Sequence, residues 1–173
     1  MPAPAFSAPE PLGSQHDFEQ FLNGRHASLD DWLRQRARAS EGLSARTYVT
    51  CTLEAPHRVV GYYAISTAAA HRVDMPSAAL RKGMPQEIPI LLIGRLAIDT
   101  VFQGRGLGPA MLADALRRCA AASAIAGVRA VIAHAIDDAA VEFYLRHGFR
   151  LVPPLGERTV LMPIEAVRQA TEA

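Results

Sequence analysis

The sequence has few of the features that mark secreted, metal-bound or membrane proteins. Its 173 residues include two cysteines, Cys51 and Cys119, without the CxxC or Cys/His spacing of a zinc site. We therefore expect buried thiols in a reducing compartment and no metal ligands. The chain does not begin with basic residues followed by an apolar run, as a signal peptide does. No stretch approaches the length of a membrane span. These absences predict a cytoplasmic protein without a membrane partner.

The chain also lacks an excess of charge of either sign. Its net charge is +1, with 50% apolar and 20% charged residues, a composition typical of soluble globular proteins. Because there is no global field, a nucleic-acid partner would depend on a local basic patch. The length suits one domain. Residues 1–15, rich in proline and alanine, predict a flexible arm before a single domain over 16–173.

The first half of the sequence predicts a helix and a hairpin. Residues 28–40 predict a helix with Ser28 as its N-cap and an apolar face. That face comprises Leu29, Trp32, Leu33 and Ala37. Two β-rich segments, 46–54 and 58–66, are separated by three residues and predict a hairpin. Residues 67–89, interrupted by prolines, predict an insertion that holds a short helix or loop.

The second half alternates strands and helices. The apolar run 88–98 is typical of a central strand covered on both faces. Asp114 and Arg118 are spaced to pair on the exposed side of the next helix. The further expected elements are a helix over 107–119, a strand over 128–133, a helix over 137–147 ended by Gly148, and a strand over 158–164. This alternation around a mixed sheet predicts an α/β or α+β class.

A glycine cluster, "QGRGLG" over residues 103–108, lies between the apolar strand and the next helix. The third position of a GxGxxG dinucleotide fingerprint holds Pro109, and the lysine of a triphosphate-binding loop is missing. The remaining pattern, QxxGxG, lets the backbone approach a ligand and leaves unpaired amides at the helix start. It predicts a pyrophosphate cradle, the alternative being a plain glycine-rich turn. Pro109 has no N–H, so the donors come mainly from 103–108.

The segments "LAID…QGRGLG" and "DDAAVEFYLRHGF" resemble motifs A and B of the GNAT N-acetyltransferases, over about 94–119 and 131–149. The resemblance implies the GNAT fold, with a mixed central β-sheet splayed at the acetyl-CoA site and flanked by helices. It implies acetyl-CoA as cofactor, with coenzyme A as product. The cofactor-binding residues it implies are Leu96, Ala97 and Ile98 for the pantetheine arm, and Gln103, Gly104, Arg105, Gly106, Leu107 and Gly108 for the pyrophosphate. Asp137, where many members carry asparagine, is a further candidate contact.

Acetyl transfer to an amine requires a neutral amine, a polarised carbonyl and a proton for the departing thiolate. The resemblance implies that Tyr144 is the catalytic proton donor beside the sulfur of coenzyme A. A phenol with a pKa near ~10 keeps its proton at neutral pH. The alternative is a core aromatic, as we expect of Phe143 and Phe149. No carboxylate–histidine pair marks a general base; His134 is a candidate that is equally explained as structural or exposed. No metal is implied.

The N-terminal half narrows the resemblance. "LDDWLRQRARASEGLSARTYV" over 29–49 and "LRKGMPQEIPILLIGRLAID" over 80–99 are similar to GNAT toxins of bacterial type II toxin–antitoxin modules, of the TacT/AtaT type. With motif B, the similarity covers most of 18–162. It implies acetylation of the α-amine of aminoacyl-tRNA, which blocks translation. It also implies a homodimer and a small DNA-binding antitoxin, commonly of the ribbon-helix-helix type.

Basic residues give this hypothesis modest independent support, because phosphate contacts need guanidinium and ammonium groups. The candidate tRNA contacts are Arg34, Arg36, Arg38, Arg81, Lys82 and Arg95. The alternative for each is solvated surface charge. On a helical wheel Arg36 falls within the apolar face, so it either extends past the core to solvent or contacts tRNA or a second subunit.

Two other functions are compatible with the same motifs. A GNAT enzyme for a small amine or a protein N-terminus would acetylate free amines or peptides without arresting growth. A regulatory module that binds acetyl-CoA without turnover would tolerate Tyr144→Phe. The presence of Tyr144 in the expected context argues against the regulatory module.

Overall fold

The computed structural model describes residues 6–172, so part of the expected arm, residues 1–5, lies outside the described residues. The described chain forms two compact units. Unit 1 comprises the described part of Met1–Ile65 together with Arg95–Asp114, and unit 2 comprises Ser66–Gly94 together with the described part of Ala115–Ala173. Both units are discontinuous in sequence because three elements run from one into the other. These are β3 (Val59–His71), β4 (Glu87–Ile98) and α4 (Leu107–Ser123).

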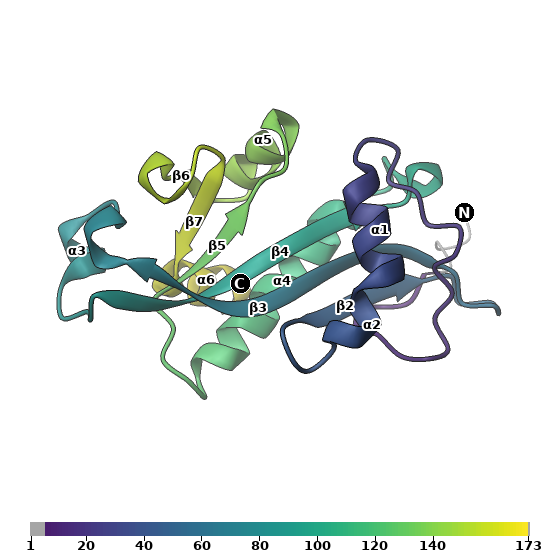
Figure 1. The fold of residues 1–173 in the computed structure, drawn as a ribbon, viewed down its shortest axis with the longest axis horizontal. Helices are drawn as coiled ribbons and strands as arrows, with labels where there is room; N and C mark the ends of the chain where they lie inside the picture. The colour runs from purple at the N-terminus through teal and green to yellow at the C-terminus, as the bar shows by residue number, and fades with distance from the viewer. Residues whose placement is uncertain (1–5, 173) are drawn as a thin grey trace. The chain divides into compact units, whose positions relative to one another are not determined.

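The strands form a seven-stranded sheet in the hydrogen-bonded order β1-β2-β3-β4-β5-β7-β6 (Figure 1). The β4–β5 pair is parallel, and the pairs β1–β2, β2–β3, β5–β7 and β6–β7 are antiparallel. The remaining strands are β1 (Glu10–Pro11), β2 (Arg46–Cys51), β5 (Ala130–His134), β6 (Arg150–Leu151) and β7 (Thr159–Pro163). A mixed sheet with interspersed helices confirms the expected fold class.

The helices are α1 (Ala27–Gln35), α2 (Ala37–Ser40), α3 (Ala78–Arg81), α4, α5 (Asp138–Arg146) and α6 (Ile164–Glu172). Short 3₁₀ turns follow β3, β4 and β6, at Arg72–Asp74, Thr100–Phe102 and Pro153–Leu155. Within residues 6–172, no helix is both long enough and apolar enough to cross a membrane.

The core of unit 1 lies between α1, α2 and the β2–β3 hairpin (Figure 1). The hairpin is antiparallel from Arg46↔Ile65 to Cys51↔Val59, as expected. Leu33 and Ala37 are fully buried against this sheet, and Leu29 and Trp32 pack at its margin. The apolar face expected from the helical spacing is therefore confirmed.

The expected helix over 28–40 differs from the structure at its start and in its middle. Helix α1 begins at Ala27 with His26 as its N-cap residue, and no side chain makes a capping hydrogen bond. Ser28 is therefore not the N-cap. The reason is Asn23, whose side-chain oxygen accepts hydrogen bonds from the amides of Arg25 (2.9 Å) and His26 (2.8 Å). The helix then breaks at Arg36, whose backbone (φ −123°, ψ −29°) separates α1 from α2.

The described part of the expected arm, residues 6–15, is held by β2. The amide of Ser7 donates to the carbonyl oxygen of Cys51 at 2.8 Å, and that of Leu12 donates to Thr47 at 2.9 Å. Strand β1 adds two residues of antiparallel pairing. Because these backbone groups are satisfied by a strand, this segment is part of the unit 1 sheet.

Helix α4 packs closely against β3 within unit 1. A Cβ at Gly61 would stand 2.8 Å from side-chain atoms of Ile98 and Met111, so the strand needs glycine there. Asp114 is buried and accepts a hydrogen bond from the hydroxyl of buried Tyr63. The expectation that Asp114 lies on the exposed side of its helix is therefore wrong, because the helix turns this carboxylate toward the sheet.

Unit 2 is built on the parallel β4–β5 pair, which runs from Ile90↔Ala130 to Ile93↔Ala133. The expected insertion is shorter than 67–89, since β3 continues to His71 and β4 begins at Glu87. Buried Met75 and Leu80 fix the intervening segment to the unit 2 core. Helix α6, which the sequence analysis missed, packs on β5 and β7.

Candidate functional site

The glycine loop of unit 1 has the backbone that a phosphate cradle requires. Gly104 and Gly106 have φ values of +79° and +78°, in the left-handed region that favours glycine. A Cβ built on either residue meets no heavy atom within 4 Å, so the space above the loop is open. The amide of Ala110 donates to the carbonyl oxygen of Gly106 at 3.3 Å, at the start of α4.

The loop also presents unpaired donors. The first amides of α4 have no partner within the helix. Within residues 6–172, the amides of Gly104, Arg105 and Gly106 donate no hydrogen bond to a protein acceptor. Amides at the start of a helix favour a negatively charged ligand. The residues present therefore fit the diphosphate of a coenzyme A thioester.

Gln103 holds the start of this loop. Its side-chain nitrogen Nε2 donates to the carbonyl oxygens of Asn23 (2.8 Å) and Ile98 (2.9 Å). An amide side chain has two N–H donors, and both have acceptors within the protein. The side chain of Gln103 thus fixes the loop, and a contact of its backbone with the cofactor stays a prediction.

Asp99 fixes the same loop from its other side. This carboxylate is 1% exposed and accepts from the amides of Val101 (2.9 Å) and Leu22 (3.2 Å) and from Nη2 of Arg58 (3.2 Å). The amide of Thr100 donates to the carbonyl oxygen of Leu22 at 2.7 Å. Residues 21–23 therefore form a strap along the start of the loop.

Sequence reasoning missed the strap and the roles of Asn23, Arg58 and Asp99. The only local signal was an aspartate directly after an apolar strand, at the N-cap of the 3₁₀ turn Thr100–Phe102. The partners of Asp99 lie 41 and 77 residues away in the sequence, so no local pattern identifies them.

The end of β4 provides the backbone expected to contact the pantetheine arm. Pairing of β4 with β5 spans Ile90 to Ile93, whereas β4 continues to Ile98. Leu96 and Ile98 are half-buried, and Ala97 belongs to the unit 1 core. Main-chain groups at 96–98 thus lie beyond the registered β4–β5 pairing, as a splayed strand requires.

Tyr144 lies on α5 in unit 2 and is 6% exposed. Its ring packs edge-on against Phe143 and Phe149, at centroid distances of 5.3 and 5.2 Å. Within the described chain, its hydroxyl has no hydrogen-bond partner. Burial raises the pKa of the phenol above its usual value. The geometry therefore gives a neutral phenol whose proton is free for a ligand.

Two other candidates in unit 2 make local contacts. His134 is exposed at the end of β5, with Nδ1 2.7 Å from the hydroxyl oxygen of Thr159. Asp137 is the N-cap of α5, and its carboxylate accepts from the amide of Ala140 at 2.8 Å. Both side chains have a structural partner, and a cofactor role for Asp137 remains a prediction.

The six basic candidates fall into two groups. Three of them hydrogen-bond to backbone carbonyl oxygens: Arg34 to Phe21 (2.6 Å), Arg38 to His16 (2.8 Å) and Arg81 to Met75 (2.7 Å). Each guanidinium therefore anchors a neighbouring segment. This anchoring occupies some of their N–H donors and leaves the other donors for a ligand.

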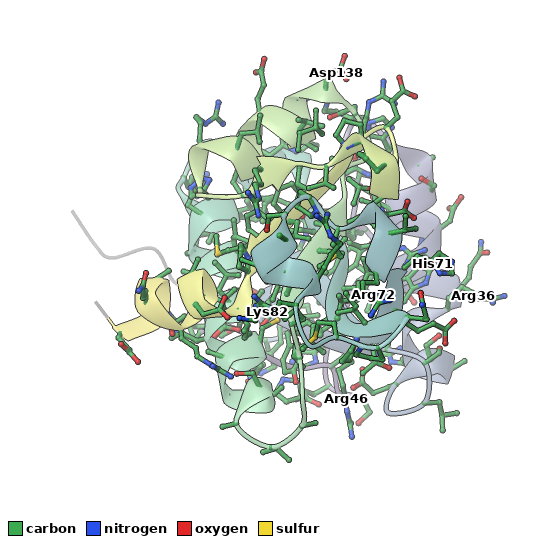
Figure 2. All side chains as sticks on the ribbon, turned by 90° about the vertical axis from the view of Figure 1, so that its left-hand side faces the viewer. Arg36, Arg46, His71, Arg72, Lys82 and Asp138 are labelled. Atoms are coloured by element: carbon green, nitrogen blue, oxygen red, sulfur yellow. The ribbon has the colours of Figure 1, made fainter. Side chains whose placement is uncertain are left out.

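The side chains of the other three, Arg36, Lys82 and Arg95, have no hydrogen bond or ion pair with residues 6–172. Arg36 and Lys82 are exposed, and their side chains are labelled in Figure 2. Arg36 reaches solvent because the helix breaks at this residue, so the helical wheel does not continue through it. The guanidinium of Arg95 lies 4.4 Å from the ring centroid of Trp32, and burial lowers its pKa below the usual value.

One group of potential metal ligands occurs in the described chain, at Glu10, His16 and Cys51. Nδ1 of His16 accepts from the amide of Gly13 (2.8 Å), and Nε2 lies 2.8 Å from the carboxylate of Glu10. This arrangement places the imidazole proton on Nε2, which leaves no lone pair there for a metal. The group is better explained as a hydrogen-bonded anchor for residues 10–16.

Comparison with known proteins assigns the family. Residues 45–151 match the acetyltransferase (GNAT) domain. The chain belongs to the GNAT acetyltransferase family. Its members transfer acetyl groups from acetyl-CoA, the donor that the glycine loop fits.

Two relatives are similar over most of the chain, and one of them, AtaT, matches in two solved structures. A tRNA-acetylating toxin of Mycobacterium tuberculosis (strain ATCC 25618 / H37Rv) is 40% identical over 149 residues, 86% of this chain and 87% of the toxin. The structure of AtaT complexed with acetyl-methionyl-tRNAfMet superposes with a TM-score of 0.86 at 26% identity, covering 95% of this chain and 98% of AtaT. A tyrosine-to-phenylalanine variant of AtaT, bound to acetyl-CoA and the C-terminus of the antitoxin AtaR, superposes with a TM-score of 0.78 at 25% identity. This match covers 95% of this chain and 97% of the AtaT variant.

Proposed function

We propose that this enzyme transfers the acetyl group of acetyl-CoA to the α-amino group of aminoacyl-tRNA and thereby acts as a toxin that blocks translation. The observation that carries the proposal is Arg95. This cation has no carboxylate partner among the described residues and directly precedes the strand residues Leu96–Ile98 of the donor site. Similarity to a tRNA-acetylating toxin over 86% of the chain supports the same acceptor.

The residues of this chain divide the chemistry between them. Bound acetyl-CoA supplies an activated thioester. The amides of 104–108 hold its diphosphate, and the backbone of 96–98 orients the pantetheine arm and polarises the carbonyl. Tyr144 donates its proton to the departing sulfur, for which a neutral phenol is suited. The proton of the amine leaves to water, because an amino ester is a weak base.

The basic candidates contact the tRNA backbone in this proposal. Arg36, Lys82 and Arg95 are the main contacts because no group among residues 6–172 neutralises them. Arg34, Arg38 and Arg81 contribute through the guanidinium donors that their backbone contacts leave over. Phosphate contacts position an RNA and do not select its sequence.

The test is transfer of label from acetyl-CoA to total charged tRNA. We expect labelled N-acetyl-aminoacyl-tRNA with the unmodified protein and at least ~100-fold less with Tyr144→Phe. Amino acid methyl esters and peptides with free N-termini serve as competing acceptors. Labelling of these alone would support the small-amine or protein N-terminus acetyltransferase instead. Equal coenzyme A binding without any transfer would support a regulatory module.

We further propose a homodimer in the cytoplasm, where charged tRNA is found, and neutralisation by a small DNA-binding antitoxin of the ribbon-helix-helix type. AtaT bound to the C-terminus of AtaR provides the parallel. Sedimentation equilibrium of the purified protein tests the dimer. Rescue of growth by co-expression of a small adjacent reading frame, with co-purification of its product, tests the antitoxin.

A further inference from the structure

Helix α1 and strand β4 form a pocket in unit 1 with a volume of about 450 Å³. Its walls are Ser28, Asp31, Trp32, Gln35, Arg36 and Arg95. This size lies within the usual range of pockets for small ligands. The chemistry proposed for the donor site uses none of the side chains of α1, so the pocket is separate from the groups that hold acetyl-CoA.

One wall of the pocket is a stack of flat groups. The indole of Trp32 lies parallel to the ring of Tyr62, with an interplanar angle of 9° and centroids 6.0 Å apart. The guanidinium of Arg95 lies over the same indole at 4.4 Å. Tyr62 is itself fixed, because its hydroxyl donates to the carbonyl oxygen of Leu29 at 2.6 Å. A rigid aromatic and guanidinium surface is therefore held at the wall of the pocket.

The charge of the pocket is positive. Arg36 and Arg95 contribute two cations and Asp31 one anion. Asp31 is already close to Arg34, with 3.7 Å between the carboxylate oxygen and Nη2. The pocket guanidinium groups have no ion pair with the described residues. Burial also lowers the pKa of Arg95, because it disfavours the charged guanidinium. A bound anion would stabilise that charged form.

Unpaired nucleotides match this combination of groups. RNA-binding proteins recognise splayed bases by stacking them on aromatic rings or guanidinium planes and by hydrogen-bonding their edges. Ser28, Asp31 and Gln35 supply hydrogen-bonding groups for a base edge, and Arg36 supplies a donor for a phosphate. An acidic peptide would use the cations but not the flat surface or the carboxylate of Asp31.

We propose that this pocket binds one unpaired nucleotide of the RNA substrate, with its base against Trp32 and Arg95 and its phosphate on Arg36. The proposal rests on the proposed function, since it assigns this nucleotide to the single-stranded 3′ end of the aminoacyl-tRNA. Arg95 is adjacent in sequence to Leu96, the first residue expected to contact the cofactor arm. The pocket thus places the end of the RNA next to the strand that presents the acetyl group.

Trp32 is the only tryptophan of the chain, so its fluorescence reports directly on the pocket. The probe is an unstructured tetraribonucleotide ending in CCA, added to the full-length protein without acetyl-CoA. We expect saturable quenching that weakens with salt, as phosphate contacts require. Inorganic pyrophosphate and a poly-glutamate peptide are the comparison ligands, and we expect neither to compete at equal charge concentration.

Two substitutions separate charge from shape. Arg95→Lys keeps the cation but removes the guanidinium plane, and we expect the dissociation constant of the tetranucleotide to rise about 10-fold. Arg36→Ala is expected to reduce the salt slope by about one. Arg46→Ala is the matched control, because Arg46, labelled in Figure 2, is an exposed arginine of the same unit. Its guanidinium pairs with the carboxylate of Glu41 at 3.4 Å. This substitution should leave binding within two-fold.

Several results overturn the proposal. They are unchanged Trp32 fluorescence with the tetranucleotide, equal binding by Arg95→Lys, or preferential binding of the acidic peptide. The proposed function is tested separately by acetyl transfer. Transfer to charged tRNA without a Trp32 response rejects the pocket alone. A Trp32 response that depends on Arg95, without any transfer, rejects the function and leaves the nucleotide site in place.

Discussion

The side-chain nitrogen of Gln103 donates a 2.8 Å hydrogen bond to the carbonyl oxygen of Asn23, 80 residues earlier in the chain. Asn23 in turn donates from its own side chain to the buried carboxylate of Asp30, in the first turn of α1, at 2.8 Å. Three side chains, those of Gln103, Asn23 and Asp30, therefore connect the glycine loop to the helix that lines the proposed nucleotide pocket.

This connection predicts that Gln103→Met weakens acetyl-CoA binding without changing the chemical step. Methionine has a similar length but no donor, so the two hydrogen bonds to Asn23 and Ile98 are lost. Each hydrogen bond contributes about 1 kcal/mol, so the loss of both predicts a rise in KM for acetyl-CoA of up to about 30-fold, with kcat within two-fold. Gln169→Met, on the exposed face of α6, is the control. A fall in kcat at unchanged KM would contradict the prediction.

The left-handed backbone of the loop predicts a specific penalty for a side chain. Gly106→Ala has room for its methyl group but must adopt φ near +78°, which costs about 1–2 kcal/mol for a residue with a Cβ. We expect a 5- to 30-fold weaker affinity for coenzyme A by calorimetry. Gly127→Ala is the control, because a Cβ at Gly127 also meets open space but the residue does not have a positive φ. This variant should bind coenzyme A with unchanged affinity.

Tyr144→Phe is expected to lower kcat at least ~100-fold and to leave thermal stability unchanged, because the hydroxyl has no hydrogen-bond partner to lose in the described part of the chain. Tyr62→Phe, which loses the bond to Leu29, should lower the melting temperature. The measurement is the melting temperature of each variant compared with that of the unmodified protein. A large loss of stability in Tyr144→Phe would show that its hydroxyl is structural.

The raised pKa of Tyr144 also predicts the pH profile. A phenol whose pKa lies above its usual value keeps its proton to higher pH, so the alkaline limb of kcat should fall above pH ~10. The measurement is kcat between pH 7 and 10.5 with saturating substrates. An alkaline limb below pH 9 that disappears in Tyr144→Phe would indicate a lowered pKa instead.

The ion pair between the buried carboxylate of Asp99 and the half-buried guanidinium of Arg58 predicts a large loss of stability in Asp99→Asn. The Nε of Arg58 is already buried without a partner among the described residues, and the substitution also removes the charge that faces Nη2. We expect a loss of about 3 kcal/mol by chemical denaturation. Asp138→Asn breaks the exposed pair with Arg158 and should leave the denaturation midpoint nearly unchanged. Equal effects of the two substitutions would refute a special role for Asp99.

Both thiols are predicted to be unreactive in the folded protein. Burial raises the pKa of Cys51 to about 12, with Glu10 adding to the effect, and burial raises that of Cys119 to about 12. At pH 8 the thiolate fraction is therefore roughly one in ten thousand. We expect no reaction with Ellman's reagent in native buffer and two equivalents after denaturation. Rapid native labelling would contradict this burial.

The sequence alone predicted what is encoded locally. Gly104 and Gly106 between a strand and a helix indicate a phosphate cradle, because only a few residues determine the φ angles and the free amides there. The apolar spacing of Leu33 and Ala37 likewise predicted a buried face. Such features depend on neighbours within one or two turns. The structure confirmed the buried face and shows both glycines with a positive φ, and the phosphate cradle stays a prediction.

Only the tertiary structure decided which polar side chains are free. Arg34 and Arg38 look like Arg36 in the sequence, yet they hold Phe21 and His16 while Arg36 has no partner among the described residues. Asp114 was expected on the surface but accepts a hydrogen bond from Tyr63, 51 residues away. A buried donor or acceptor needs a hydrogen-bond partner. Because folding brings distant segments together, that partner can lie anywhere in the sequence, and no local pattern identifies it.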